Sequence, residues 1–313
     1  VAVEPEVDRR GLDHRGVVGL QRDATRVDLG QDVAVAQQHG AQASDAALLG
    51  AGGAGGGDEV DDVVGEFGAR SVLDIGCGTG TFGLLLAERG VPAVAVDLPG
   101  HGRSAWREDG DYGPKLAAEA LVPILREHAP DTRLVVGMSL GGLTALRIAA
   151  TEPSLVPGLV LIDVTPSAPE RHTEMTKAQM GTVALVREDR SFPSFAAMLD
   201  VTVAAAPHRD RKSLRRGVFH NSKQLDDGTW TWRYDSFRKG DGFENLWDDV
   251  PAITMPTTLI RGANSFFVND EDADTFARTA PGFQRTHVVQ GAGHSVQGDQ
   301  PAALVQLLRD VLG

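Results

Sequence analysis

The chain has 313 residues and carries 30 Lys and Arg against 43 Asp and Glu, which gives a formal net charge of −13. An acidic surface repels phosphate backbones and anionic membranes, so both nucleic acid and a membrane surface are disfavoured as partners. No apolar run reaches the roughly 18 residues of a membrane span, and residues 1–10 lack the basic-then-apolar pattern of a secretory signal. Because the single cysteine, Cys77, also excludes an intrachain disulfide, we expect a cytoplasmic protein.

Much of the acidic charge lies in the first 66 residues. Residues 1–66 contain 5 Arg against 13 Asp and Glu, and no Phe, Trp, Tyr, Ile or Lys. They show neither strand alternation nor a helical apolar stripe, and they end in a glycine-rich run. Such a segment buries too little apolar surface to offset its ordering entropy, so we expect a poorly ordered extension. An acidic regulatory or partner-binding tail is the alternative.

From Phe67 onward, short apolar runs alternate with amphipathic stretches, a pattern typical of a doubly wound, mostly parallel α/β sheet. The predicted strands are 71–75, 92–97, 133–137, 158–163, 257–262 and 284–290, and the predicted helices are 81–89, 115–128, 140–151, 271–280 and 301–312. The alternation stops between Asp163 and Thr257. This stretch is richer in Arg, Met and aromatic residues, which predicts an insertion of mainly helices.

A serine lies at the turn between the predicted strand 133–137 and the predicted helix 140–151. The turn reads Gly137-Met138-Ser139-Leu140-Gly141, and small residues two before and two after the serine are needed where the backbone is crowded. This geometry lifts the Ser139 hydroxyl clear of the sheet and directs the N–H of Leu140, at the helix N-terminus, toward a developing oxyanion. The setting predicts a nucleophilic Ser139, with a structural serine as the alternative.

A nucleophilic serine needs a base, and the chain contains nine histidines. His294 follows the last predicted strand and precedes the final helix, which places it at the same sheet edge as Ser139. His101 fits a turn better, His287 lies within a strand, and the histidines of the insertion are expected at the surface or in a substrate pocket. No pair of histidines has metal-ligand spacing with a nearby carboxylate, so no metal site is expected.

Two carboxylates compete for the role of orienting His294. Asp163 ends the predicted strand 158–163, 24 positions after Ser139. Asp270 lies eight positions after the end of the strand 257–262, so a loop has to carry it back to the site. Because an acid at a strand end is held rigidly, Asp163 is favoured over Asp270.

From about residue 84 to residue 313 the sequence resembles the α/β-hydrolase superfamily, through DLPGHGRS, the elbow GMSLGG, LVLIDVTP, TTLIRGANS and QGAGHS. The resemblance implies a core at 67–165 and 250–313 and a helical cap at 166–249, inserted between the sixth and seventh strands. In the branch with R-G-x-x-S after strand seven, as at 261–265, the acid commonly follows strand six, which favours Asp163 further.

The same resemblance implies an activity. A serine nucleophile in this fold hydrolyses carboxylic esters or related acyl substrates through an acyl-enzyme intermediate, and no cofactor is expected. The substrate is then a small acyl or ester molecule held between cap and core. Met138, Trp230 and Trp232 are candidates for the substrate pocket, although buried aromatic residues are more often part of a core.

Residues 69–90 depart from that family. A hydrolase of this kind has its first strands further upstream, here within 1–66, and then a strand ending in His-Gly whose loop supplies a second oxyanion N–H. This chain instead reads ARSVLDIGCGTGTFGLLLAERG. With Gly76, Gly78 and Gly80 after the strand, and Asp97 lying 23 residues beyond Asp74, residues 60–97 resemble the first motif of class I methyltransferases that use S-adenosylmethionine.

Three interpretations follow. In the first, N–H groups of Gly76 and Cys77 replace the His-Gly loop in a working hydrolase, since a glycine-rich turn can direct N–H groups into a site. In the second, the chain is a rearranged hydrolase impaired by the loss of one oxyanion donor. In the third, Gly76, Gly78, Gly80 and Asp97 bind S-adenosylmethionine. The first is favoured.

Overall fold

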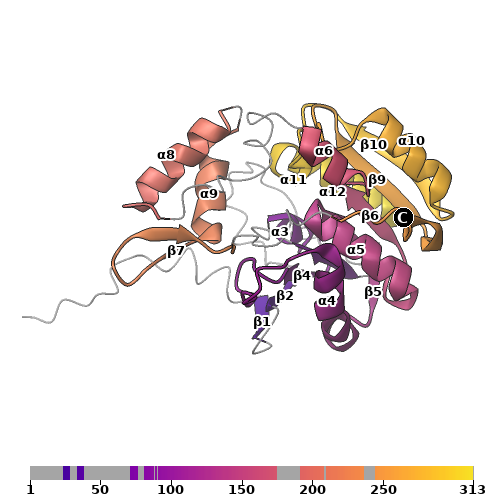
Figure 1. Ribbon diagram of the computed structural model, residues 1–313, viewed down its shortest axis with the longest axis horizontal. Coiled ribbons are helices and arrows are strands. Elements are labelled where there is room, and N and C mark those ends of the chain that lie inside the picture. Colours follow the sequence, from indigo (N-terminus) through magenta and orange to yellow (C-terminus); the bar gives the residue numbers. More distant parts are fainter. Residues whose placement is uncertain are drawn as a thin grey trace, which may run out of the picture.

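The centre of the molecule is an eight-stranded sheet with the strand order β1-β2-β4-β3-β5-β6-β9-β10 (Figure 1). The computed structural model describes residues 24–28, 34–38, 71–76, 81–87, 89, 91–174, 191–207, 209–235 and 244–312. The strands are β1 (Ala24–Asp28), β2 (Ala34–Gln38), β3 (Ser71–Ile75), β4 (Ala93–Asp97), β5 (Thr132–Met138), β6 (Leu159–Ile162), β9 (Thr257–Gly262) and β10 (Phe283–Val289).

All pairings from β4 to β10 are parallel, whereas β1 pairs with β2, and β2 with β4, in antiparallel fashion. The chain passes from β3 to β4 on one side and then crosses to β5 on the other, so the strand order reverses at β3. This arrangement confirms the predicted doubly wound, mostly parallel sheet. Ligands of such sheets bind beyond the carboxyl ends of the strands where the order reverses, which here lies between β3 and β5.

Two segments of the acidic leader form strands at one edge of the sheet. β1 and β2 make a hairpin-like antiparallel pair, and β2 then pairs with β4 with Ala34 opposite Asp97. The hydrolase resemblance places the first strands of the fold in this part of the chain. The rest of the predicted extension, like most of residues 1–70, lies outside the described residues.

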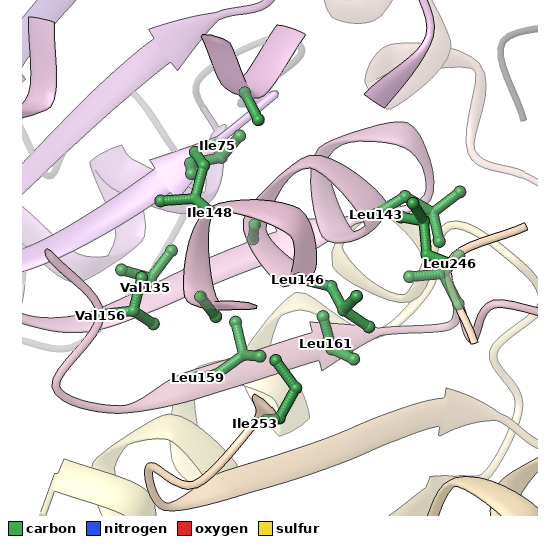
Figure 2. Packing of buried hydrophobic residues seen from close by; sticks show 14 of the residues in the cluster. Ile75, Val135, Leu143, Leu146, Ile148, Val156, Leu159, Leu161, Leu246 and Ile253 are labelled. Carbon is green, nitrogen blue, oxygen red and sulfur yellow. The ribbon is translucent and has the colours of Figure 1, made fainter. Parts of the chain in front are cut away.

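Helices cover both faces of the sheet because successive strand residues point to opposite sides. Leu73 and Ile75 of β3 belong to one buried cluster, and Val72 belongs to the other. The first cluster is completed by α4 (Pro114–His128), α5 (Leu140–Thr151) and α10 (Asp270–Thr279), and the second by α3 (Thr81–Ala87) and α12 (Pro301–Leu312). In Figure 2, Leu146 and Ile148 of α5 lie within the first cluster together with strand residues such as Leu161.

The insertion between β6 and β9 corresponds to the predicted cap. It contains α6 (Ala168–Glu174), α8 (Phe195–Ala205), α9 (Arg211–Asn221) and the antiparallel pair β7 (Ser222–Gln224) and β8 (Trp230–Trp232). Figure 1 shows α8, α9 and β7 grouped apart from the helices that flank the sheet. The helices agree with the predicted insertion, but the hairpin was not expected there. Its turn ends at Gly228, whose φ of 84° suits glycine. The predicted boundaries of core and cap stay predictions.

Candidate active site

Ser139 lies at the sharp turn from β5 into α5, with the backbone angles φ 51° and ψ −124°. This conformation is rare for a residue with a side chain, and it is tolerated because the flanking glycines let the backbone pack closely. A Cβ atom at Gly137 would lie 2.5 Å from the carbonyl oxygen of Gly141, and a Cβ at Gly141 would overlap the carbonyl oxygen of Ile75. Only glycine at these positions permits the turn that holds Ser139 half-buried at the sheet edge.

Leu140 is the first residue of α5. Its N–H therefore has no carbonyl four residues back within the helix, and the positive end of the helix dipole lies beside Ser139. The role of this N–H as an oxyanion donor stays a prediction.

Asp163 follows β6, is fully buried, and also has a positive φ of 51°. Its N–H donates to the carbonyl of Ile260 at 2.7 Å, which fixes the residue to the end of β9. Its Oδ1 atom accepts the N–H of Gly262 at 2.9 Å. Its Oδ2 atom accepts the Ser265 hydroxyl and lies 2.8 Å from Nδ1 of His294. The carboxylate thus has hydrogen-bond partners on both oxygens, as a buried charge requires.

His294 lies in the loop between β10 and α11 (Val296–Asp299), with only 6% of its surface exposed. With Nδ1 on the Asp163 carboxylate, Nε2 is the ring nitrogen left for proton transfer. The ring stacks on Phe267, with centroids 4.2 Å apart and planes inclined by 25°. The preceding Gly293 N–H donates to Oδ2 of Asp299 at 2.9 Å. The imidazole is therefore fixed by a carboxylate, an aromatic face and its own loop.

Ser265 and Phe267 are the residues that sequence reasoning missed. Ser265 donates to Asp163 and accepts the N–H of Phe267 at 3.1 Å, so one hydroxyl connects the carboxylate to the ring that supports His294. The signal was present in R-G-x-x-S, because it places a hydroxyl three residues after a strand end. That spacing does not by itself show which way the loop turns.

Asp270, the alternative acid, lies elsewhere. It begins α10, its side chain is 86% exposed, and it forms an ion pair with Arg261. The loop from 263 to 269 brings Ser265 and Phe267 back to the site, whereas Asp270 remains at the surface.

The turn after β3 lies against the elbow, since a Cβ at Gly76 would be 3.2 Å from Cα of Gly141. However, the N–H of Gly76 donates to the carbonyl of Val96 at 2.9 Å, as part of the sheet. The expectation that Gly76 supplies an oxyanion N–H is therefore wrong, because that donor is already used. Cys77, Gly78 and Gly80 lie outside the described residues.

The three predicted pocket residues lie in different surroundings. Met138 is half-buried and directly precedes Ser139. Trp232 is only 2% exposed and belongs to the cap's own buried cluster, against which Trp230 packs. Trp232 is thus packed inside the insertion with residues of α8 and α9 and does not line a pocket. The ring centroids of Trp232 and Phe192 lie 6.1 Å apart.

Asp74 is a buried carboxyl group close to the site. It lies in β3, one residue before Ile75, and is 7% exposed. Burial, together with a smaller effect of the negative charge of Asp97, raises its pKa from 3.8 to about 7. Asp97 itself accepts the N–H of Arg103 at 3.2 Å, and its carboxylate lies where a Cβ on Gly102 would be, so it stabilises the turn after β4.

Within the described parts of the chain, no group of three or more His, Cys, Asp or Glu side chains is arranged to hold a metal ion. In the same residues, no helix is both long enough and apolar enough to cross a membrane.

Comparison with known proteins shows which family the chain belongs to. Residues 75–307 match the model of the alpha/beta hydrolase family. The chain belongs to the alpha/beta hydrolase family. The predicted superfamily and the prediction of a hydrolase enzyme are confirmed. The family match begins at Ile75 and includes Asp97, whereas the resemblance of residues 60–97 to methyltransferases stays a prediction.

Individual relatives of this hydrolase are similar over most of its length. Esterase Rv0045c of Mycobacterium tuberculosis is 60% identical over 232 residues, which are 74% of this chain and 78% of the relative. Its crystal structure superposes with a TM-score of 0.75 at 44% identity, covering 97% of this chain and 99% of that one. Esterase YbfF of Escherichia coli is 26% identical over 226 residues, which are 70% of this chain and 82% of the relative.

Proposed function

We propose that this hydrolase cleaves carboxylic esters, with Ser139 as nucleophile, His294 as general base and Asp163 as the acid that orients the histidine. The observation that carries the proposal is the 2.8 Å contact between Nδ1 of His294 and a fully buried Asp163, at the sheet edge where Ser139 forms the elbow. The names of two relatives, esterases Rv0045c and YbfF, support the same substrate class.

In the proposed reaction, Nε2 of His294 removes the proton from Ser139 Oγ as that oxygen attacks the ester carbonyl carbon. The carbonyl oxygen becomes an oxyanion that accepts the N–H of Leu140. When the tetrahedral intermediate collapses, the bond to the leaving alkoxide breaks and His294 gives its proton to that oxygen. A water molecule, deprotonated by His294, then attacks the acyl-enzyme, and the acid is released as Ser139 regains its proton.

Asp163 is preferred to Asp270 because of its surroundings. A buried carboxylate that is bonded to the imidazole holds the ring in one tautomer and stabilises its protonated form. Asp163 makes this contact, whereas Asp270 is exposed and paired with Arg261. Ser265 acts as a positioning residue, because its hydroxyl binds the same Asp163 oxygen that faces His294.

For the second oxyanion donor we propose the backbone N–H of Cys77, a residue outside the described part of the chain. The turn that follows β3 contacts the elbow through Gly76 and Gly141, and Gly76 is already bonded to Val96. The next N–H along the chain is that of Cys77. An enzyme without a second donor loses about 10²–10³ in kcat, so this position decides between a working and an impaired hydrolase.

Turnover of short p-nitrophenyl esters tests the proposal. Ser139→Ala should abolish hydrolysis, whereas Ser154→Ala, at an exposed serine in the short helix after α5, should keep wild-type rates. Retention of turnover in Ser139→Ala, or absence of turnover in the wild-type protein, would refute the assignment.

A methyltransferase function would need Gly76, Gly78, Gly80 and Asp97 to hold S-adenosylmethionine. The Asp97 carboxylate is already engaged with the turn at Gly102 and Arg103. We therefore expect that the protein does not bind S-adenosylmethionine. Calorimetric titration with S-adenosylmethionine should show no binding heat.

A further inference from the structure

Asp299 has a buried carboxylate that binds two different parts of the chain. It is the last residue of α11, and its side chain is only 6% exposed. One oxygen, Oδ1, accepts the Nε–H of Arg209 at 2.8 Å, and the other, Oδ2, accepts the N–H of Gly293 at 2.9 Å. Arg209 belongs to the insertion between β6 and β9, whereas Gly293 directly precedes His294. A single carboxylate therefore connects the insertion to the loop of the proposed general base.

Arg209 lies between α8 and α9 and reaches α11 with its guanidinium. Its side chain is 18% exposed, so the ion pair with Asp299 is largely shielded from water. The guanidinium packs against α11, since a Cβ at Gly298 would lie 3.8 Å from Cζ of Arg209. The N–H of Arg209 donates to the carbonyl of Ala206, at the end of α8, at 3.1 Å. Arg209 is thus fixed both by the end of α8 and by the carboxylate.

The backbone before His294 is held from two sides. On one side, the N–H of Asn264, which follows β9, donates to the carbonyl of Ala292 at 2.9 Å. On the other side, the N–H of Gly293 donates to Asp299. These contacts orient the peptide groups next to His294, so a shift of the Gly293 peptide moves the imidazole relative to the rest of the proposed triad. A misplacement of about 1 Å in such a site costs about a hundredfold in rate.

The contact at Gly293 depends on Arg209. A buried carboxylate is stable only where cations or hydrogen-bond donors satisfy its oxygens. When Arg209 moves away, Oδ1 of Asp299 loses its cation, and the carboxylate gains hydration by turning toward water. The N–H of Gly293 then loses its acceptor, and the loop of His294 loses this support. The docking of the insertion therefore affects the placement of the imidazole through Asp299.

A second ion pair between the insertion and the core supports a different part of the chain. Arg171 of α6 donates from Nε and Nη2 to Asp272 of α10 at 2.9 and 3.3 Å, and the Asp272 side chain is 4% exposed. The same carboxylate accepts the N–H of Asn269 at the start of α10. Neither Asp272 nor Asn269 adjoins a residue of the proposed triad in the chain. This pair therefore attaches the insertion without holding the loop of the general base.

We propose that Asp299 is a positioning residue for His294, and that it has this role only while Arg209 is bound to it. The inference rests on the proposed ester hydrolysis at Ser139, and it adds a conformational control of that site. The imidazole is placed for proton transfer while the insertion is docked, and it is displaced when the insertion moves away. An insertion that only bound the substrate would change KM, whereas the Arg209–Asp299 pair also determines kcat.

The test measures kcat and KM for p-nitrophenyl acetate, whose small acyl group offers the insertion little to bind. We expect Arg209→Ala and Asp299→Asn each to lower kcat about tenfold, because the general base loses one hydrogen bond that positions it. Arg209→Lys, which keeps a cation at this position, should restore part of the loss. Both residues act through one contact, so the double variant should also lose about tenfold rather than the roughly hundredfold of two independent effects.

Arg171→Ala is the matched control, because it also removes an arginine from a buried carboxylate that attaches the insertion. It should lower the melting temperature, as Arg209→Ala does, but keep the wild-type kcat for p-nitrophenyl acetate. An unchanged kcat in Arg209→Ala, an equal loss of kcat in Arg171→Ala, or losses that multiply in the double variant would overturn the inference and leave the proposed function intact. Absence of ester hydrolysis by the wild-type protein would refute the proposed function, and this inference with it.

Discussion

Replacing Asp74 with asparagine should stabilise the protein at alkaline pH and not at acidic pH. Asp74 lies in β3, between β4 and β5, and is 7% exposed. Burial and, to a lesser extent, the negative charge of Asp97 together raise the pKa of its carboxyl group from 3.8 to about 7. The native state therefore favours the neutral acid, and ionisation is opposed by the apolar surroundings and by a second negative charge.

The sign of the pH dependence follows from proton linkage. Between the unfolded pKa of 3.8 and the folded pKa of about 7, the native state binds more protons than the unfolded state. Stability therefore falls as the pH rises through this window, and the loss is complete above the folded pKa. A shift of about three units at about 1.4 kcal/mol each corresponds to about 4 kcal/mol of unfolding free energy. Asp74→Asn removes this ionisation.

The assay is urea unfolding of the wild type and Asp74→Asn at pH 4.5 and pH 8.5. The free energy of unfolding of Asp74→Asn, measured relative to the wild type, should be higher at pH 8.5 than at pH 4.5. The difference between the two pH values should be a few kcal/mol, up to about 4. Asp226→Asn, at an exposed position of the hairpin turn, serves as the control and should change little between the two pH values. If Asp74→Asn changes the free energy of unfolding equally at both pH values, the reasoning is refuted. Such a result would show that ionisation of Asp74 does not destabilise the native state.

Three further substitutions test the site. Asp163→Asn should lower kcat by about 10³–10⁴, because His294 loses the carboxylate that sets its tautomer, whereas Asp270→Asn should stay within about twofold; the reverse ranking in steady-state kinetics would exchange their roles. Ser265→Ala should lower kcat by about tenfold with a smaller change in KM, since the Asp163 carboxylate loses one donor, and an unchanged kcat would show that this hydroxyl does not position it. Arg209→Ala, which frees the cap from Asp299, should raise KM and lower the melting temperature, whereas Arg211→Ala, at an exposed pair within the cap, should change neither measurably.

The sheet was predictable from the sequence because strands buried on both faces appear as short apolar runs between amphipathic helices. β3 and β9 have the bounds expected from their patterns, and α5 and α12 also do. The approach of Asp163 to His294 follows from topology, since both come after strands whose carboxyl ends meet at one edge. β1 and β2 were not predicted as particular segments, because they contain only small or polar residues besides valine and show no apolar face.

Other features depend on geometry that the sequence does not contain. The Ser265–Phe267 loop could turn either way after β9, and only its hydrogen bonds show that it supports Asp163 and His294. Gly76 was expected to donate an N–H to the site, but the pairing of β3 with β4 uses that group. Trp232 was assigned to the pocket because the β7–β8 hairpin was not predicted. Without the hairpin, the sequence did not show that the indole is buried against the helices of the insertion.

Covalent labelling of the nucleophile tests the central claim most directly. The protein is reacted with a fluorophosphonate and the modified peptide is located by mass spectrometry. The proposed mechanism predicts one adduct on Ser139, absent in Ser139→Ala and formed far more slowly in His294→Ala. An adduct on another residue, or labelling that is unchanged in Ser139→Ala, would contradict it.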